Sequence, residues 1–127
     1  MKAIIFGSTG QDGSHLSELL LEKGYEVVAV ARRTSTGNLN RISHLTVSKN
    51  FSVESADITD SFSVMNVFRA HRDVTEVYNL AAQSHVAVSF KQPAITWDIT
   101  GKGCLNIIQS MVDLKLNFHN HLVANRP

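Results

Sequence analysis

Three glycines at three-residue spacing, placed directly after a short apolar run, constrain this chain more than any other feature. The run Lys2–Phe6 leads at once into a loop that reads Gly7, Ser8, Thr9, Gly10, Gln11, Asp12 and Gly13. Leucines then recur at helical spacing. Glycine permits a tight turn, a close approach of a ligand to the backbone, and close packing of a helix on a strand. The feature predicts a strand, a loop and a helix whose N-terminus, with about half a unit of positive charge, faces a pyrophosphate. A glycine-rich turn without a ligand is the alternative.

Apolar runs and helical patterns alternate along the rest of the chain. Strands are predicted at Lys2–Phe6, Tyr25–Ala31, Phe51–Ser55 and Glu76–Leu80. Their apolar, β-branched composition is typical of strands buried on both faces of a parallel sheet. No internal repeat or glycine- and proline-rich linker divides the chain. The pattern therefore favours one domain.

Three helices are predicted between or after these strands. In the first, Leu16, Leu19, Leu20 and Lys23 fall at helical spacing, and Gly24 suits the left-handed turn that ends the helix. The second is capped by Asp60, and its inner face is predicted to consist of Phe62, Met65 and Phe68. The third starts near Pro93 and runs through Ile107, Ile108 and Met111 toward Leu114. This order predicts the α/β class, with a Rossmann-type doubly wound parallel sheet and ligands at the carboxyl ends of its strands.

Two arginines follow the second predicted strand, where an NAD-binding protein usually carries a carboxylate for the ribose hydroxyl. A carboxylate would repel a 2′-phosphate, whereas the guanidinium of Arg32 can bind it through two parallel hydrogen bonds. The sequence therefore predicts NADP as the cofactor. Two solvated arginines at a strand end are the alternative reading.

Polar and small residues follow the third and fourth predicted strands at the same edge. Asp57 is predicted to accept a hydrogen bond from the adenine amino group, and Ile58 to lie against the ring. The nicotinamide side is predicted to be lined by Leu80, Ala81, Ala82, Gln83 and Ser84. Ser84 and His85 are candidates for contact with a substrate, although a structural role for His85 is an equal alternative.

Composition limits the classes of partner. Twelve Lys and Arg against eleven Asp and Glu give a net charge of +1, so no global field would attract nucleic acid or an anionic membrane. The single cysteine, Cys104, and the lack of a signal or membrane-spanning segment predict a cytoplasmic location. The pair His119 and His121 lacks further ligands nearby, so no metal site is predicted.

Several segments together closely resemble the GDP-mannose 4,6-dehydratases, a family of extended short-chain dehydrogenase/reductases, whose glycine spacing is also the one found here. The matching segments are 7–14, 18–27, 32–33, 41–42, 57–60 and 76–86. The resemblance implies tightly bound NADP, GDP-mannose as substrate, GDP-4-keto-6-deoxymannose as product, and a role in supplying fucose and related deoxysugars. It assigns the 2′-phosphate to Arg32, Arg33, Thr34 and Ser35. It also implies a homo-oligomer in the full-length family, in which a segment like 34–41 reaches a neighbouring subunit.

The resemblance covers about residues 1–116, and residues 117–127 are expected to be a divergent tail. The family pattern would continue with a fifth strand, a catalytic segment containing Ser, Thr and Glu, and a Tyr-x-x-x-Lys pair. Neither Tyr25 nor Tyr78 has a lysine four residues on. Without the tyrosine and lysine, the acid–base partner of hydride transfer is absent. The sequence therefore predicts a truncated, catalytically inactive cofactor-binding portion. The open alternatives are an NADP-binding remnant and another reductase or epimerase acting on a sugar nucleotide.

Overall fold

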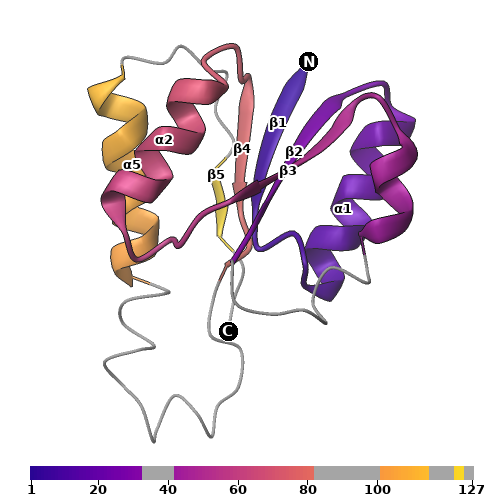
Figure 1. The fold of residues 1–127 in the computed structure, drawn as a ribbon. Helices are drawn as coiled ribbons and strands as arrows, with labels where there is room; N and C mark the ends of the chain where they lie inside the picture. Colours follow the sequence, from indigo (N-terminus) through magenta and orange to yellow (C-terminus); the bar gives the residue numbers. More distant parts are fainter. Residues whose placement is uncertain (33–41, 82–100, 115–121, 125–127) are drawn as a thin grey trace, which may run out of the picture.

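The computed structural model describes residues 1–32, 42–81, 101–114 and 122–124 (Figure 1). Its elements in chain order are β1 (Lys2–Phe6), α1 (Gln11–Glu22), β2 (Glu26–Ala31), the 3-10 helix η2 (Ser43–Val47), β3 (Phe51–Ser55), α2 (Ser61–Ala70), β4 (Glu76–Asn79), α5 (Gly103–Asp113) and β5 (Leu122–Ala124).

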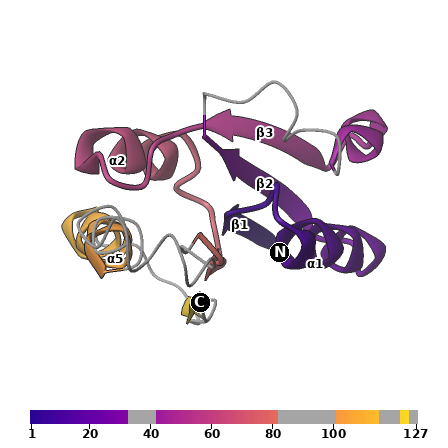
Figure 2. The same cartoon turned by 90° about the horizontal axis from the view of Figure 1, so that it is seen from below.

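The five strands found in the described residues are all parallel and lie in the order β3-β2-β1-β4-β5. Helices α2 and α5 pack together on one face of the sheet, and α1 lies on the other face (Figures 1 and 2). The prediction of a Rossmann-type, doubly wound parallel sheet is confirmed. The chain reverses its direction of travel across the sheet between β1 and β4, which is where such folds bind ligands.

Alternate residues of the central strands supply two separate cores. In β1, Ile4 and Phe6 face the α2 and α5 side, whereas Ala3 and Ile5 face the α1 side. The valines of β2 divide in the same way. This two-sided burial explains why these strands read as continuous apolar runs.

Two predictions of burial were wrong. Strand β3 lies at the edge of the sheet, and Ser52, Val53 and Ser55 are exposed on it. Helix α2 is capped by Asp60 as predicted, but its Phe62 side chain is 65% exposed. The helix buries Val64, Val67 and Phe68 instead, a stripe at i, i+3 and i+4.

The ends of the other elements follow the sequence less closely. Gly24 has the expected left-handed backbone, with φ of +84°, just after α1. The start of the third helix near Pro93 lies outside the described residues, but Lys102 already has helical dihedral angles before α5. The sequence predicts no strand within residues 117–127, whereas β5 pairs in parallel with β4 there. The third predicted helix does run through Ile107, Ile108 and Met111 as α5, and Ile108 lies on its outer side, 41% exposed.

Candidate functional site

The glycine loop lies at the carboxyl ends of three adjacent strands. Phe6, the last residue of β1, is in register with Val30 of β2 and Asn79 of β4. Gly7 follows with φ of +83°, and a Cβ atom there would lie 2.6 Å from the backbone nitrogen of Ala81. Only glycine fits both this dihedral angle and this close approach. The loop is therefore held against the residues that follow β4.

The other two glycines shape the start of helix α1. A Cβ atom at Gly13 would overlap the carbonyl oxygen of Gly7 and lie 2.7 Å from the Cα atom of Ser8. The N–H of Gly10 donates to the carbonyl of Gly7 at 3.2 Å. Gly10 is also the N-cap of α1, and no side chain among the described residues caps the helix there. The N-terminus of α1 thus remains open to an anion.

The remaining loop residues divide between the interior and the surface. Ser8 is fully buried, and its hydroxyl donates to the carbonyl of Val30 at 3.2 Å, so its side chain ties the loop to β2. Thr9 is half-buried. Gln11 and Asp12, in the first turn of α1, are exposed. Any contact of Ser8 with a ligand would therefore be through its backbone.

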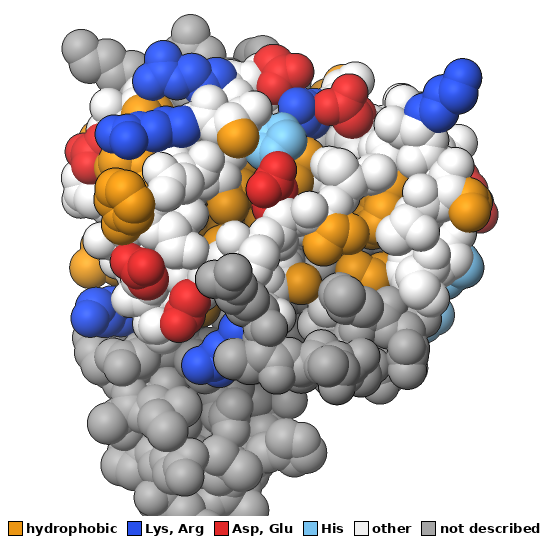
Figure 3. All heavy atoms as spheres, in the orientation of Figure 1, with side chains coloured by type: hydrophobic (Ala, Val, Ile, Leu, Met, Phe, Trp, Pro, Cys, Tyr) orange, Lys and Arg blue, Asp and Glu red, His pale blue; other side chains and the backbone are white. Residues whose placement is uncertain are grey.

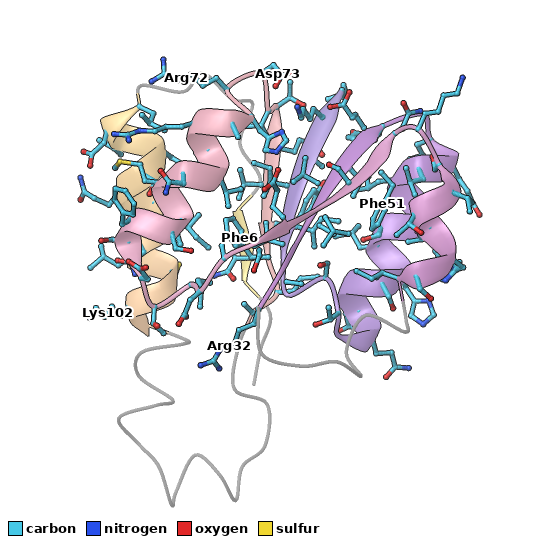
Figure 4. The ribbon with its side chains drawn as sticks, in the orientation of Figure 1. Phe6, Arg32, Phe51, Arg72, Asp73 and Lys102 are labelled. Carbon is cyan, nitrogen blue, oxygen red and sulfur yellow. The ribbon has the colours of Figure 1, made fainter. Side chains whose placement is uncertain are left out.

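A cavity of about 160 Å³ opens beside the loop. It is lined by Phe6, Gly7, Thr9, Val30, Arg32, Ala56, Asp57, Ile58 and Ala81. Figure 4 shows Arg32 at the carboxyl edge of the sheet and Arg72 and Asp73 at the opposite edge. The structure thus brings together the predicted glycine loop, Arg32, the residues after β3 and the first residues after β4.

Asp57 is held in its anionic form by its surroundings. Its Oδ1 accepts hydrogen bonds from the N–H of Thr59 at 3.0 Å and from the Thr59 hydroxyl at 2.8 Å. Burial alone would raise the pKa of Asp57, but these hydrogen bonds and the positive charge of Arg32 hold the pKa below its ordinary value. A carboxylate is therefore available at the mouth of the cavity as a hydrogen-bond acceptor.

Two residues of α5, neither of them predicted to belong to the site, lie against Ile58. The Nδ2 atom of Asn106 donates to the carbonyl of Ile58 at 2.9 Å. A Cβ atom at Gly103 would lie 2.9 Å from Cγ1 of Ile58. An amide at an inner position of an amphipathic helix was the one signal in the sequence that pointed to Asn106.

The residues after β4 are described only as far as Ala81. The N–H of Leu80 donates to the carbonyl of Phe6 at 2.8 Å, and the N–H of Ala81 donates to Oδ1 of the buried Asn79 at 3.2 Å. The other predicted site residues lie outside the described residues: Arg33, Thr34, Ser35, Ala82, Gln83, Ser84 and His85. The segment 34–41, predicted to reach a neighbouring subunit, also lies outside them.

The hydroxyl groups of both tyrosines of the chain form hydrogen bonds away from the glycine loop. The hydroxyl of Tyr25 donates to Oε1 of Glu76 at 3.0 Å, and the hydroxyl of Tyr78 donates to Oε2 of the same carboxylate at 2.7 Å. Glu76 opens β4 and is in register with Ala3, so it lies toward the amino edge of the sheet. The two phenols are therefore committed to a buried carboxylate on the far side from the glycine loop.

The described parts of the chain carry surface charges of both signs. On the face seen in Figure 3, basic and acidic side chains are interspersed, so no single-sign field covers this face. None of the described helices is both long and apolar enough to cross a membrane. The same residues contain no group of three His, Cys, Asp or Glu side chains placed to hold a metal ion.

The sheet order and the glycine loop at the β1 and β4 ends define the chain as a Rossmann-type α/β protein. A sequence model of the family described as GDP-mannose 4,6 dehydratase matches residues 4–123. The chain belongs to this family.

Individual relatives agree with the family model. The GDP-mannose 4,6-dehydratase of Yersinia enterocolitica is 44% identical over 117 residues, which are 87% of this chain and 31% of the relative. The human GDP-mannose 4,6 dehydratase is 43% identical over 115 residues, 86% of this chain and 31% of the relative. The chain therefore spans 31% of the length of these two relatives.

Solved structures of epimerases share the fold. UDP-glucose 4-epimerase from Thermotoga maritima, solved with UDP-glucose, has a TM-score of 0.76 and 29% identity, covering 93% of this chain and 36% of that one. The same enzyme from Thermus thermophilus, in complex with NAD, has a TM-score of 0.76 and 29% identity, covering 92% and 35%.

Proposed function

We propose that this chain is the NADP-binding part of a GDP-mannose 4,6-dehydratase, an enzyme that converts GDP-mannose into GDP-4-keto-6-deoxymannose and water. The observation that carries the proposal is the glycine loop. Gly7 and Gly13 allow backbone to pack where side chains would collide, and the uncapped start of α1 faces the same strand edge as Arg32. This arrangement offers backbone donors and a cation to a phosphorylated dinucleotide.

The residues at the edge fit the parts of a nicotinamide dinucleotide. The loop 7–13 would hold the pyrophosphate, mainly through backbone N–H groups, because Ser8 directs its side chain inward. Asp57 and Ile58 would flank the adenine, and Ala81, which also lines the cavity, would begin the wall on the nicotinamide side, with Leu80 just before it. When bound, the cofactor would supply an acceptor for a hydride from the sugar.

Arg32 is the basis for preferring NADP over NAD. It is exposed at the cavity, and its charge already affects Asp57. A guanidinium here would attract the 2′-phosphate that distinguishes NADP, although a structural relative was solved with NAD. Both dinucleotides share the pyrophosphate, so the loop alone does not discriminate between them.

A polypeptide of these 127 residues alone is proposed to bind the cofactor without turning over GDP-mannose. Its tyrosines donate to Glu76 and lack a lysine four residues on, so neither can serve as the acid–base partner. Incubation with GDP-mannose and NADP, followed by chromatography of the sugar nucleotides, is expected to return only GDP-mannose. Formation of the 4-keto product would contradict this part of the proposal.

The cofactor assignment is tested by calorimetric titration of the chain with NADP and with NAD. We expect tighter binding of NADP, and Arg32→Ala is expected to weaken NADP binding by about 10- to 100-fold, the value of one charge-assisted phosphate contact, while NAD binding changes little. Arg72→Ala is the matched control, because Arg72 is also exposed but lies at the opposite edge (Figure 4). Equal affinity of the unmodified chain for the two dinucleotides would reverse the assignment.

A further inference from the structure

The side of helix α5 that is buried carries unusual residues for a helix packed on a sheet. Its buried positions are Gly103, Asn106, Ile107 and Ser110, at the spacing of one helical stripe. Three of these four side chains are small or polar. Leu105 and Val112 of the same helix point outward and are 59% and 63% exposed, whereas Ile107, Met111 and Leu114 pack on the core. Apolar packing alone therefore does not explain the inner stripe.

Asn106 is the most informative member of that stripe. Its residue is 8% exposed, and its Nδ2 atom donates to the carbonyl of Ile58, 48 positions earlier in the chain, at 2.9 Å. Burying an amide is unfavourable unless it forms hydrogen bonds. The contact with Ile58 supplies such a bond and connects α5 directly to the turn between β3 and α2.

Gly103, one turn earlier, faces the side chain of the same residue. A Cβ atom added at Gly103 would lie 2.9 Å from Cγ1 and 3.1 Å from Cδ1 of Ile58. The absence of a side chain at this position thus leaves space that Ile58 occupies. Helix α5 contacts Ile58 in two ways, through a hydrogen bond to its backbone and through a matched surface to its side chain.

The turn has its own hydrogen bonds, which fix its shape. The N–H of Asp60 donates to the carbonyl of Asp57 at 3.0 Å, and the N–H of Asp57 donates to the Ser63 hydroxyl at 3.0 Å. The N–H of Ala56 also ties the turn to β2. These bonds do not involve α5. The Asn106 bond joins the turn to that helix, and Asp57 and Ile58 of the turn line the cavity.

We propose that Asn106 is a positioning residue for the nucleotide base, acting through the Ile58 carbonyl to place the Asp57 carboxylate and the Ile58 side chain that select adenine. The inference rests on the proposed function, because it assumes that a dinucleotide occupies the cavity. It adds that the preference for the base depends on α5, an element that does not line the cavity.

The test compares NADP with its hypoxanthine analogue, in which an oxo group replaces the adenine amino group. A carboxylate acceptor at Asp57 is expected to favour NADP by about 10-fold. Asn106→Ala is expected to weaken NADP binding by about 3- to 10-fold and to reduce the preference to about 2-fold, with little effect on the analogue. A general loss of stability would weaken the binding of both ligands equally and leave the ratio of the two affinities unchanged.

Gln109→Ala is the matched control, since Gln109 is an exposed amide on the same helix that bonds only Asp113 among the described residues. It is expected to leave both affinities unchanged. Gly103→Ala provides a second route, because its methyl group would displace Ile58 without removing the Asn106 amide. It is expected to reduce the base preference as well, and it replaces Asn106→Ala if that variant does not fold by circular dichroism.

The outcomes separate the two proposals. An unmodified chain that binds neither NADP nor 2′,5′-ADP contradicts the proposed function, and the inference falls with it. An unmodified chain that binds NADP but shows no base preference overturns the inference alone. A folded Asn106→Ala variant that keeps the original preference for adenine also overturns the inference. If Asn106→Ala does not fold, a folded Gly103→Ala variant that keeps this preference overturns it instead.

Discussion

The two edges of the sheet use polar residues in different ways. At the amino edge, charged side chains pair with one another, and Nζ of Lys2 lies 3.0 Å from both Glu26 and Asp73. At the carboxyl edge, the backbone does most of the bonding within the loop, and Arg32 has no carboxylate within 4 Å among the described residues. The charged side chains of the amino edge are therefore paired with one another, whereas the carboxyl edge has backbone donors and a cation that fit the proposed ligand.

If the proposed function is correct, a sheet with polar residues at both edges has one edge that stabilises the fold and one edge that binds a ligand. Side chains that satisfy each other, such as Tyr25 with Glu76, stabilise the fold but offer little to a ligand. The glycines of the loop have no side chain with which to form such pairs. They allow close contacts between backbone segments instead, and leave the loop backbone accessible to the proposed ligand. Substitutions at the two edges are accordingly expected to separate binding from stability.

The largest separation is expected between two glycines with the same left-handed backbone. Gly7→Ala is expected to abolish NADP binding, by more than about 100-fold, and to cost about 2–4 kcal/mol of stability, because strain at φ of +83° adds to a collision with Ala81. Gly24→Ala has φ of +84° but no atom within 4 Å of the added Cβ, so only about 1–2 kcal/mol of strain is expected. Urea denaturation and NADP titration of both variants make the comparison. Weakened binding in Gly24→Ala would argue against the division between the edges.

A smaller separation of the opposite kind is expected at Glu76, where a substitution should lower stability and leave NADP binding unchanged. Glu76→Gln keeps the size of the side chain but turns one acceptor of the two tyrosine hydroxyls into a donor. We expect a loss of about 1–3 kcal/mol in the free energy of unfolding, measured with urea, and unchanged affinity for NADP. A change in NADP affinity that exceeds the change in stability would show that the amino edge contributes to the site.

The smallest effect is expected in alkaline solution. The hydrogen bond to Glu76 raises the pKa of Tyr25, and burial together with a bond to Glu76 raises the pKa of Tyr78. Because both pKa values are higher in the folded chain than in the unfolded chain, their contribution is complete below about pH 10 and is lost as the pH rises above it. Urea midpoints between pH 8 and pH 11 are expected to fall, and to fall less in Tyr78→Phe. Identical slopes for the two proteins would exclude Tyr78 as a cause.

Features encoded by neighbouring residues could be predicted from the sequence. The glycine loop, the left-handed Gly24 and the Asp60 cap depend on local backbone requirements that few residue types meet. The wrong face of α2 shows the limit of this approach. The predicted face consists of Phe62, Met65 and Phe68, and the buried stripe consists of Val64, Val67 and Phe68. Both sets contain Phe68 and both follow helical spacing, so the spacing alone did not decide between them.

Features that depend on distant contacts could not be predicted in the same way. The role of Asn106 depends on Ile58, 48 positions away, and no short motif encodes that pairing. Strand β5 contains only Leu122, Val123 and Ala124, too few residues for a periodic pattern. Its pairing with β4 supplies what the local sequence does not specify.

The buried hydroxyl of Ser8 has a kinetic consequence. Because it fastens the glycine loop to the β2 backbone, the loop loses its conformational freedom when the chain folds and not when a nucleotide arrives. On the proposed function, capture of a nucleotide would then require no rearrangement of this loop, and its rate would be set by the diffusional encounter with a preformed surface.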